Sequence, residues 1–453
     1  MPNRPPPSEG PTSVSRQPGD GVVIDPFRGW SFDPARVQVD DAVCPPYDVV
    51  EPDDDERMRR RSPYNVVRLV RPKGPPVSDG SRPRTRYEQA ADLLTSWRQD
   101  GTLVRAAAPA LYVYEQRGSG GAQRGVIGAV EVRDPADGVV VPHEDVFAGP
   151  VADRLALMTA TNAQLEPILL TTDGLDPLES WLATISATVP TVVARPEDGT
   201  EHRLWPISDP VQIRVVQDAV RGSSALIADG HHRYATYRRM RAERRSAGLG
   251  AGPWDRGLVL LVGTAPGALT LGAIHRTVRD IALPVPTRGD ELDRTAVVVT
   301  ALPGVDATDP GALLACIAEP AEARRVRAGL TVSLVATDGS RVVRLDCRPL
   351  GAGVRDRLPA TVMSERVLPE LFGRDDGDHR VDYHHDAAHA ISAAASTGGV
   401  AILLPAPMLH EVRALAEAGA RMPRKSTSFG PKPRSGLVLR DLDWSPQRRH
   451  GSG

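Results

Sequence analysis

The chain has 453 residues, a length that predicts two or three domains. Its 55 basic and 57 acidic side chains leave a formal net charge of −2, which excludes a bulk polyanion-binding protein because such a protein needs a basic excess. Hydrophobic residues make up 41% of the chain and charged residues 25%, as in ordinary globular proteins, so a sizeable core is expected.

Cysteine usage and the apolar runs bear on the compartment. Cys44, Cys316 and Cys347 are far apart and form no CxxC motif, which favours a reducing compartment. Residues 1–21 lack the apolar run of a secretory signal, and they and residues 443–453 are expected to be disordered tails. Two long stretches, residues 257–274 and 387–410, contain no Asp, Glu, Lys or Arg. Glycine and proline interrupt both, so neither offers the unbroken run of about 20 apolar residues that a membrane span needs. We therefore expect a soluble, cytoplasmic protein.

The first predicted elements mix helices and strands. A charged helix is expected over residues 53–61, and SPYNVVRLV (62–70) is expected to be a strand because β-branched residues follow a turn. Residues 87–100 have helical spacing, with Gly101 directly after the helix end. Two alternating strands around a glycine-rich turn, 109–117 and 125–133, predict a hairpin.

The later elements alternate in the same irregular way. Helices are predicted over residues 151–165, 209–220 (with Asp209 as N-cap), 231–245, 382–395 and 408–420. Strands are predicted over residues 200–208, 224–229, 258–263, 268–274, 331–337, 341–347 and 399–405. This order, together with the hairpin, predicts an α/β protein with a mixed sheet and irregularly interspersed helices.

The turn after the strand SALIAD has the most informative residues of the chain. A strand–turn–helix junction presents backbone N–H groups and the positive end of a helix dipole, which bind phosphate. Gly230 allows the backbone to approach closely or to take a positive φ, and His231, His232 and Arg233 add donors. Asp229 lies at a strand end, where carboxylates commonly hold Mg²⁺. The pattern predicts a site for a Mg²⁺-bound di- or triphosphate; the alternative is a helix cap with solvent-exposed histidines.

Two other segments carry candidate site residues. His143 and Glu144 lie on a loop just past a predicted strand, where Glu144 either acts as a general base or only caps the next segment. Lys425 and Lys432, two of the three lysines in the chain, flank Thr427 in RKSTSFGPKP. This segment either clamps an anionic ligand or forms a solvated basic loop.

Three further sets of polar residues are less specific. Tyr47, in PPYDVV, and Asn65, in SPYNVVRL, are candidate substrate contacts. His385 and His389 are one helical turn apart, as metal ligands often are. Because Asp386 takes the place of the Glu that the zinc-protease pattern requires, we interpret these histidines as helix surface.

Seven motifs occur in one order along the chain: DPFRGW, CPPYDVV, SPYNVVRL, LYVYEQ, PHEDVFAGPVADRL, ADGHHRYAT and KSTSFGPKPRSGLV. With this series the chain, from about residue 22 to residue 439, resembles the conserved bacterial and archaeal family labelled domain of unknown function one-thousand-and-fifteen. The family label itself implies no activity.

Residues 136–245 also resemble the ParB and sulfiredoxin superfamily, nearest its free-serine kinases, which phosphorylate L-serine with a nucleoside di- or triphosphate. This resemblance implies that residues 230–233 hold the phosphates, that Glu144 takes the proton from the substrate hydroxyl, and that Asp229 helps with the metal or the substrate. Sulfiredoxin's own chemistry is disfavoured because its phosphate turn needs a Cys. The chromosome-partitioning branch is disfavoured because it needs a helix-turn-helix domain that the sequence does not show.

The sequence therefore predicts an N-terminal α/β region (22–135), a ParB/sulfiredoxin-like nucleotide-binding core (136–245) and a C-terminal α/β region (246–442). The predicted function is an ATP- or ADP-dependent phosphotransferase that uses Mg²⁺ and acts on a small hydroxylated metabolite, with free serine as a candidate. A nucleotide-binding switch without transferase activity, and a phosphatase or nucleotide hydrolase, stay open. We expect a small-molecule substrate and no nucleic-acid or membrane partner, and leave homo-oligomerisation open. The candidate substrate contacts are His143, Lys425, Thr427, Lys432, Tyr47 and Asn65.

Overall fold

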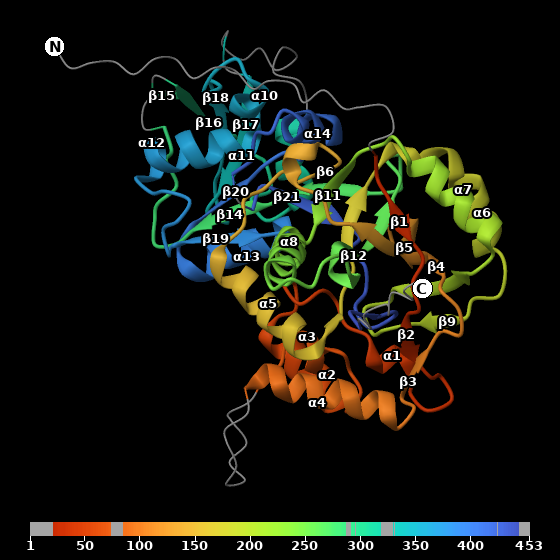
Figure 1. The fold of residues 1–453 in the computed structure, drawn as a ribbon. Helices are drawn as coiled ribbons and strands as arrows, with labels where there is room; N and C mark the ends of the chain where they lie inside the picture. The colour runs from red at the N-terminus through yellow and green to blue at the C-terminus, as the bar shows by residue number, and fades with distance from the viewer. Residues whose placement is uncertain are drawn as a thin grey trace, which may run out of the picture. The chain divides into compact units, whose positions relative to one another are not determined.

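A computed structural model describes residues 21–73, 85–286, 291–294, 296–318, 329, 331–423 and 425–443 (Figure 1). Of the two predicted tails, only Gly21 and Asp443 lie inside the described residues. The chain divides into two compact units. Of the described residues, unit 1 holds 143–145 and 270–430, and unit 2 holds the rest. The predicted boundaries near residues 135 and 245 stay a prediction.

Unit 2 is built around a large mixed sheet. In its described residues, the strand order is β6 (Val140–Val141), β11 (Ala225–Asp229), β8 (Ile168–Thr171), β12 (Arg256–Val262), β5 (Gly121–Glu131), β4 (Leu111–Gly118), β10 (Glu201–Ile207) and β9 (Val192–Ala194), with β1 (Ile24–Asp25) paired to β5. Two pairs, β6–β11 and β8–β12, are parallel, and the others are antiparallel. The predicted mixed α/β sheet and the predicted β4–β5 hairpin are confirmed.

Helices and two short strand pairs complete unit 2. The helices are α1 (Val39–Ala42), α2 (Pro52–Arg61), α3 (Val67–Val70), α4 (Arg86–Gln99), α5 (Ala148–Thr161), α6 (Glu179–Ser186), α7 (Pro210–Val220) and α8 (His231–Ser246). The short pairs are β2 (Trp30–Phe32) with β3 (Leu103–Arg105), and β7 (Ala163–Gln164) with β22 (Arg440–Asp441). Helix α8 packs on β8 and β12 and buries Tyr234, Tyr237 and Met240 in the core.

Local chemistry explains where several helices begin and end. Asp209 accepts a hydrogen bond from the N–H of Val211 at the start of α7, as predicted. At the start of α4, Thr85 and Glu88 form a reciprocal capping box, and Gly101 takes a φ of +78° after its end. These contacts satisfy backbone donors that a helix start otherwise leaves without intrahelical partners.

Unit 1 has a second sheet. In the described residues its order is β15 (Glu291–Arg294), β16 (Val297–Ala301), β18 (Val342–Cys347), β17 (Val332–Thr337), β20 (Val400–Leu403), β14 (His275–Val278) and β19 (Val381–His384). A separate antiparallel pair joins β13 (Thr270–Ala273) to β21 (Thr427–Gly430). The helices are α9 (Pro310–Ala318), α10 (Val354–Arg357), α11 (Pro359–Val362), α12 (Leu368–Phe372), α13 (Ala387–Thr397) and α14 (Leu409–Glu417). Their apolar side chains form two core clusters.

The prediction of a strand in SPYNVVRLV was wrong. Residues 67–70 form the short helix α3. The Asn65 amide oxygen accepts from the N–H of Val67 (2.9 Å), and its amide nitrogen donates to the carbonyls of Asp41 (2.7 Å) and Val43 (3.0 Å). This side chain bends the backbone into a turn, and the tertiary bonds outweigh the strand preference of the valines.

The helix predicted over residues 382–395 begins later than expected. Residues up to His384 belong to strand β19, and Asp386 caps α13 by accepting from the N–H of His389 (2.9 Å). His385 therefore precedes the helix and contacts the Ser428 hydroxyl (2.9 Å). The prediction that His385 and His389 lie one turn apart on the same helix was therefore wrong, because the helix begins only after its cap, Asp386.

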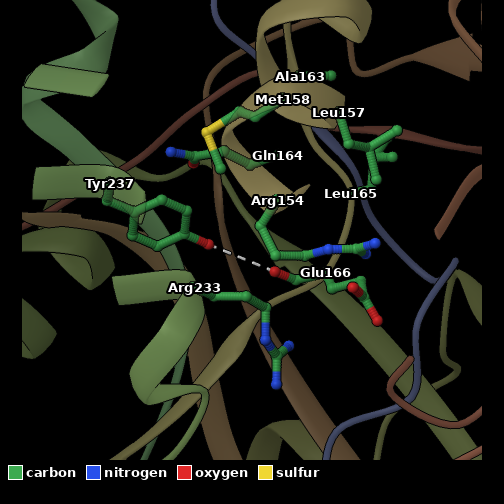
Figure 2. A pocket seen from close by; sticks show the side chains of 9 residues that line it. All are labelled: Arg154, Leu157, Met158, Ala163, Gln164, Leu165, Glu166, Arg233 and Tyr237. Carbon is green, nitrogen blue, oxygen red and sulfur yellow. Dashed lines mark hydrogen bonds between the residues drawn. The ribbon is translucent and has the colours of Figure 1, made fainter. Parts of the chain in front are cut away.

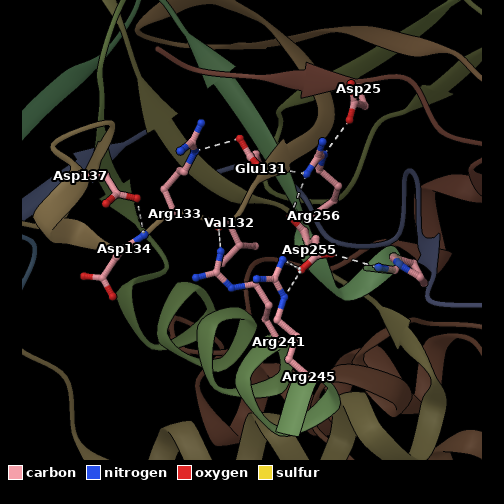
Figure 3. Close-up of polar contacts among 12 residues, drawn as sticks. Asp25, Glu131, Val132, Arg133, Asp134, Asp137, Arg241, Arg245, Asp255 and Arg256 are labelled. Atoms are coloured by element: carbon pink, nitrogen blue, oxygen red, sulfur yellow. Dashed lines mark hydrogen bonds and ion pairs between the residues drawn. The ribbon is translucent and has the colours of Figure 1, made fainter. Parts of the chain in front are cut away.

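The arginines in the second half of α8 are used within unit 2 (Figure 3). Arg245 pairs with Asp255 (2.9 Å), and Arg241 donates to the carbonyl of Val132. Arg238 pairs with Asp134 (2.6 Å). Arg238, Arg241 and Arg245 therefore each have a partner inside unit 2.

Within the described residues, no helix combines the length and the apolar character that crossing a membrane requires. Cys44, Cys316 and Cys347 are free thiols, and burial raises the pKa values of Cys44 and Cys347 above their usual range.

Candidate functional site

The centre of the candidate site in unit 2 is the carboxylate of Asp229, the last residue of β11. One oxygen lies 2.5 Å from Nζ of Lys432, and the other accepts from Arg233 at 2.7 Å. Lys432 also lies 3.7 Å from the carboxylate of Asp48. Burial lowers the pKa of Lys432, but Asp229 and Asp48 outweigh burial and raise it overall. The structure thus joins Lys432 to the predicted turn, although about 200 residues separate them in the sequence.

Gly230 connects this carboxylate to α8 and has the conformation that the sequence predicted. Its φ is +94°, in the left-handed region that favours glycine. A Cβ added here would lie 2.6 Å from Cγ2 of Ile168 and 3.2 Å from Nε of Arg233. The absence of a side chain therefore lets β11 turn directly into the helix.

Helices α5 and α8 begin side by side. The N–H of Phe147, the residue before α5, donates to Nε2 of His232 in the first turn of α8 (3.0 Å). One turn further along both helices, the hydroxyl of Thr236 donates to the carbonyl of Val151 (3.3 Å). Because both contacts advance in the same chain direction, the two helices run parallel here and their positive dipole ends lie together.

Neither of these two helix starts is neutralised in the usual way. In the described residues, α5 and α8 have no acidic side chain in the first turn and no side-chain capping bond, whereas α4 and α7 are capped. The first turn of α8 even carries His231, His232 and Arg233. The charge of Arg233 is already balanced by the Asp229 carboxylate, so the two helix dipoles, and not these side chains, favour an anion here.

Arg233 is buried and has internal partners. Its side chain is 4% exposed, donates to the carbonyl of Pro167 (2.8 Å), and pairs with Asp229. Burial lowers its pKa, but Glu166 and Asp229 outweigh burial and raise the pKa overall. The predicted fork onto phosphate oxygens would require these bonds to open, and it stays a prediction.

Glu166 is a buried carboxylate next to Arg233. It lines a cavity of about 30 Å³ with Arg154, Arg233 and Tyr237 (Figure 2). One carboxylate oxygen accepts from the N–H of Tyr47 and from the hydroxyl of Ser435, both at 2.9 Å. Burial raises the pKa of Glu166, while Arg233 and Arg154 oppose that shift. Glu166 therefore positions both the Tyr47 backbone and the arginines behind the turn.

Tyr47, predicted as a substrate contact, belongs to the same neighbourhood. The guanidinium carbon of Arg154 lies 4.2 Å from the Tyr47 ring centre, and that of Arg233 lies 5.9 Å away. Burial raises the pKa of Tyr47 to about 12, so the hydroxyl stays protonated at neutral pH. The Tyr47 ring thus makes cation–π contacts with both arginines.

In unit 1, the carboxylate of Glu144 is the centre of a hydrogen-bonded cluster with His143, Ser426 and Thr427. One oxygen of Glu144 accepts from the Thr427 hydroxyl (3.1 Å) and from the N–H of Ser426 (3.3 Å). Nε2 of the buried His143 lies 2.8 Å from the Thr427 hydroxyl. Since that hydroxyl has one proton and donates it to Glu144, it accepts from His143. The predicted residues His143, Glu144 and Thr427 are thus brought together.

The charge state of Glu144 follows from these partners. Burial raises the pKa of Glu144, and the bonds from Ser426 and Thr427 and the charge of Lys425 only partly oppose that shift. Lys425 itself is exposed and has a φ of +55°. A carboxylate with a raised pKa accepts a proton more readily than an ordinary one, as general-base chemistry requires.

Asn65 is used differently from the other candidates. Its amide is bound to three backbone groups, and the side chain lines a separate pocket of about 150 Å³ with Asp41 and Arg61. The predicted substrate contact of Asn65 stays a prediction.

Mg²⁺ is poorly matched by the surroundings of Asp229. Both of its oxygens already bind cationic side chains, and the described part of the chain has no group of three or more His, Cys, Asp or Glu that could hold a metal ion. These contacts do not fit direct ligation of Mg²⁺ by Asp229. That role stays a prediction.

Sequence reasoning missed Glu166 and the use of Lys432 as the partner of Asp229. The only signal for Glu166 was one acidic residue inside the apolar run QLEPILL. An acidic residue in such a run is buried only when paired, so it could have been singled out. No local pattern could have paired Lys432 with Asp229.

The fold and the turn define a mixed α/β protein with two adjacent helix starts at a strand–helix junction. The chain belongs to the family described as Protein of unknown function (DUF1015), whose model matches residues 24–335. No curated protein matches the chain.

Solved structures show distant similarity. Free serine kinase in complex with AMP is 16% identical, with 67% of this chain and 88% of that chain covered and a TM-score of 0.33. A conserved hypothetical protein from Pyrococcus furiosus is 13% identical, with 67% and 92% covered and a TM-score of 0.31. SbnI with a C-terminal truncation, from Staphylococcus aureus, is 12% identical, with 70% and 87% covered and a TM-score of 0.34.

Proposed function

We propose that this protein is a nucleotide-dependent phosphotransferase that acts on a small hydroxylated metabolite, with free serine as the candidate acceptor. The observation that carries the proposal is the pair of parallel helix starts, α5 and α8, without acidic residues in their first turns. Two aligned dipole ends and a nearby lysine attract a di- or triphosphate. A ParB/sulfiredoxin-like core is part of this proposal.

In the proposed reaction, the turn at residues 229–233 holds the phosphates of ATP or ADP. The acceptor hydroxyl oxygen forms a bond to the terminal phosphorus, and the bond from that phosphorus to the bridging oxygen breaks. ADP leaves when ATP is the donor, and AMP leaves when ADP is the donor. The hydroxyl proton passes to a base. Such catalysis depends on positioning and charge stabilisation, so clustered donors suit it better than a covalent nucleophile.

We propose Glu144 as that base, because its carboxylate is largely buried and its partners within unit 1 are neutral donors. His143 and Thr427 would orient it, since a relay of hydrogen bonds fixes which oxygen stays available.

The proposal is tested by calorimetric titration of the full chain with ATP, ADP and CTP, with Mg²⁺ and with EDTA. A screen of hydroxylated metabolites for phosphorylated product and a phosphate-release assay follow. Nucleotide binding with acceptor-dependent product supports the proposal. Binding without product indicates a switch, and phosphate release without an acceptor indicates a hydrolase. Absence of nucleotide binding contradicts the transferase, the switch and a nucleotide hydrolase.

A further inference from the structure

Phe147 is an unusual residue for this chain. The protein has only five phenylalanines, and all lie in the described residues. Four are 8% exposed or less, namely Phe27, Phe32, Phe372 and Phe429. Phe147 is 44% exposed, and its neighbour Val146 is 38% exposed. Single exposed apolar side chains are ordinary on protein surfaces, so the place of this ring in the fold, and not its exposure alone, carries the inference below.

The ring lies beside the helix starts that carry the proposed function. Phe147 directly precedes α5, and its ring is parallel to that of His232, with an angle of 7° and 6.0 Å between centroids. The hydrogen bond from the N–H of Phe147 to Nε2 of His232 fixes the backbone at this point. The backbone of Phe147 is therefore fixed next to the first turn of α8 by a hydrogen bond that does not depend on its side chain.

Hydrophobic capping does not account for this position. In a hydrophobic staple, the residue before the N-cap packs against the first turns of the helix, but Phe147 is itself the N-cap of α5. Phe147 instead remains nearly half exposed and aligns with an imidazole of a different helix. Flat, exposed aromatic rings beside phosphate-binding groups are suited to stacking on nucleobases, since every base presents a π-face.

We propose that Phe147 is a stacking platform for the base of the nucleotide whose phosphates bind at the starts of α5 and α8. This inference rests on the proposed nucleotide site and assigns its base-binding part. Stacking depends on ring area, so the platform favours purines over pyrimidines and does not choose between adenine and guanine.

The test compares ADP with inorganic tripolyphosphate, which carries phosphates and no base. Both are titrated calorimetrically into the full chain and into F147A, F147L and F147W. We expect F147A and F147L to bind ADP about tenfold more weakly, and F147W to bind it as the parent does. Tripolyphosphate affinity stays unchanged in all three. V211A, at another exposed apolar side chain (59%), is the matched control and binds both ligands as the parent does.

Two results distinguish the failure of this inference from that of the proposed function. If the parent binds ADP and F147A binds it equally well, Phe147 is not the platform, and the proposed function is untouched. If the parent binds neither ADP nor tripolyphosphate, the proposed function fails and the platform with it. An equal loss of ADP and tripolyphosphate binding in F147A also overturns the inference, because the effect would then not depend on the base. Thermal melting confirms that each variant is folded.

Discussion

Glu144 in unit 1 and Asp229 in unit 2 are carboxylates whose hydrogen-bond partners differ in charge. Asp229 lies between two cations, Lys432 and Arg233, which satisfy both of its oxygens. Glu144 accepts from a hydroxyl and a backbone N–H, and burial raises its pKa. For Glu144, burial outweighs the hydrogen bonds from Ser426 and Thr427 and the charge of Lys425, so this carboxylate takes up a proton more readily than an ordinary one.

The two residues were predicted to have different tasks: Glu144 was predicted to be the base, and Asp229 was predicted to help in catalysis and to bind metal. The role of Asp229 stays a prediction, and its observed contacts hold Lys432 and Arg233 at the start of α8. Glu144 is the base that we propose. Changes at Glu144 should therefore affect turnover, and changes around Asp229 should affect ligand binding and stability.

The largest expected effect is on turnover in E144Q. Loss of a general base lowers the rate by about 10²- to 10⁴-fold, while nucleotide affinity stays within about twofold of the parent. Steady-state kinetics with the acceptor found by screening, together with calorimetry, measure both quantities. A variant that turns over within a few-fold of the parent would remove Glu144 from the proposed role.

The next effect is on stability and anion binding in K432M. Removing one partner of a largely buried pair leaves Asp229 with Arg233 alone, so we expect a loss of about 2 kcal/mol in unfolding free energy. Tripolyphosphate should bind about tenfold more weakly. K432R, which keeps the charge, is the control. Unchanged denaturation and binding in K432M would mean that this pair matters for neither.

The same pair predicts a pH dependence. Because the pKa of Lys432 is raised in the folded protein, its contribution is fully present below the unfolded value of about 10.4 and disappears as the pH rises through the folded value. The stability gap between parent and K432M should be constant from pH 7 to about 10 and then close. A gap that widens above pH 10 would contradict the direction of this shift.

An effect on stability alone, of similar size to that in K432M, is expected for G230A. Alanine at a φ of +94° is strained, and its Cβ would lie 2.6 Å from Cγ2 of Ile168, so we expect a loss of about 1–3 kcal/mol in unfolding free energy. Gly149, in the first turn of α5, is the matched control, because a Cβ added there meets nothing within 4 Å. Chemical denaturation of G230A and G149A measures both. Equal stability of the two variants would argue against the strained turn.

The smallest effect is on the pH dependence of stability in E144Q. A carboxyl group whose pKa is raised by folding destabilises the native state above that pKa and has no such effect below the unfolded value of about 4.3. E144Q should therefore melt at a higher temperature than the parent at pH 8, and the difference should shrink as the pH falls toward 4. A difference that grows on acidification would reverse the assigned direction.

Much of the fold could be predicted because the signals are local. The strand ending at Asp229, the glycine turn and helix α8 follow one another in sequence, and Asp209 caps α7 as its position predicted. The strand predicted around Asn65 failed because hydrogen bonds to Asp41 and Val43, more than 20 residues away, decide the backbone there. Local propensity has no access to such bonds.

The site was predicted in part for the same reason. Residue types in the turn predicted an anion site, and the structure adds the second helix start at Phe147, which no local pattern links to His232. The rarity of lysine drew attention to Lys432, but its partner Asp229 could only be found in the fold. Pairing across long stretches of chain is what the sequence alone does not reveal.

We propose that the adjacent starts of α5 and α8 bind the phosphates of a nucleotide. Hydrogen exchange of the full chain, followed by mass spectrometry with and without ADP, can detect this binding at the level of single segments. We expect slower exchange in the peptides that contain residues 147–152 and 230–235, because their backbone N–H groups would contact the ligand. ADP binding that leaves both segments unchanged and protects another part of the chain would contradict it.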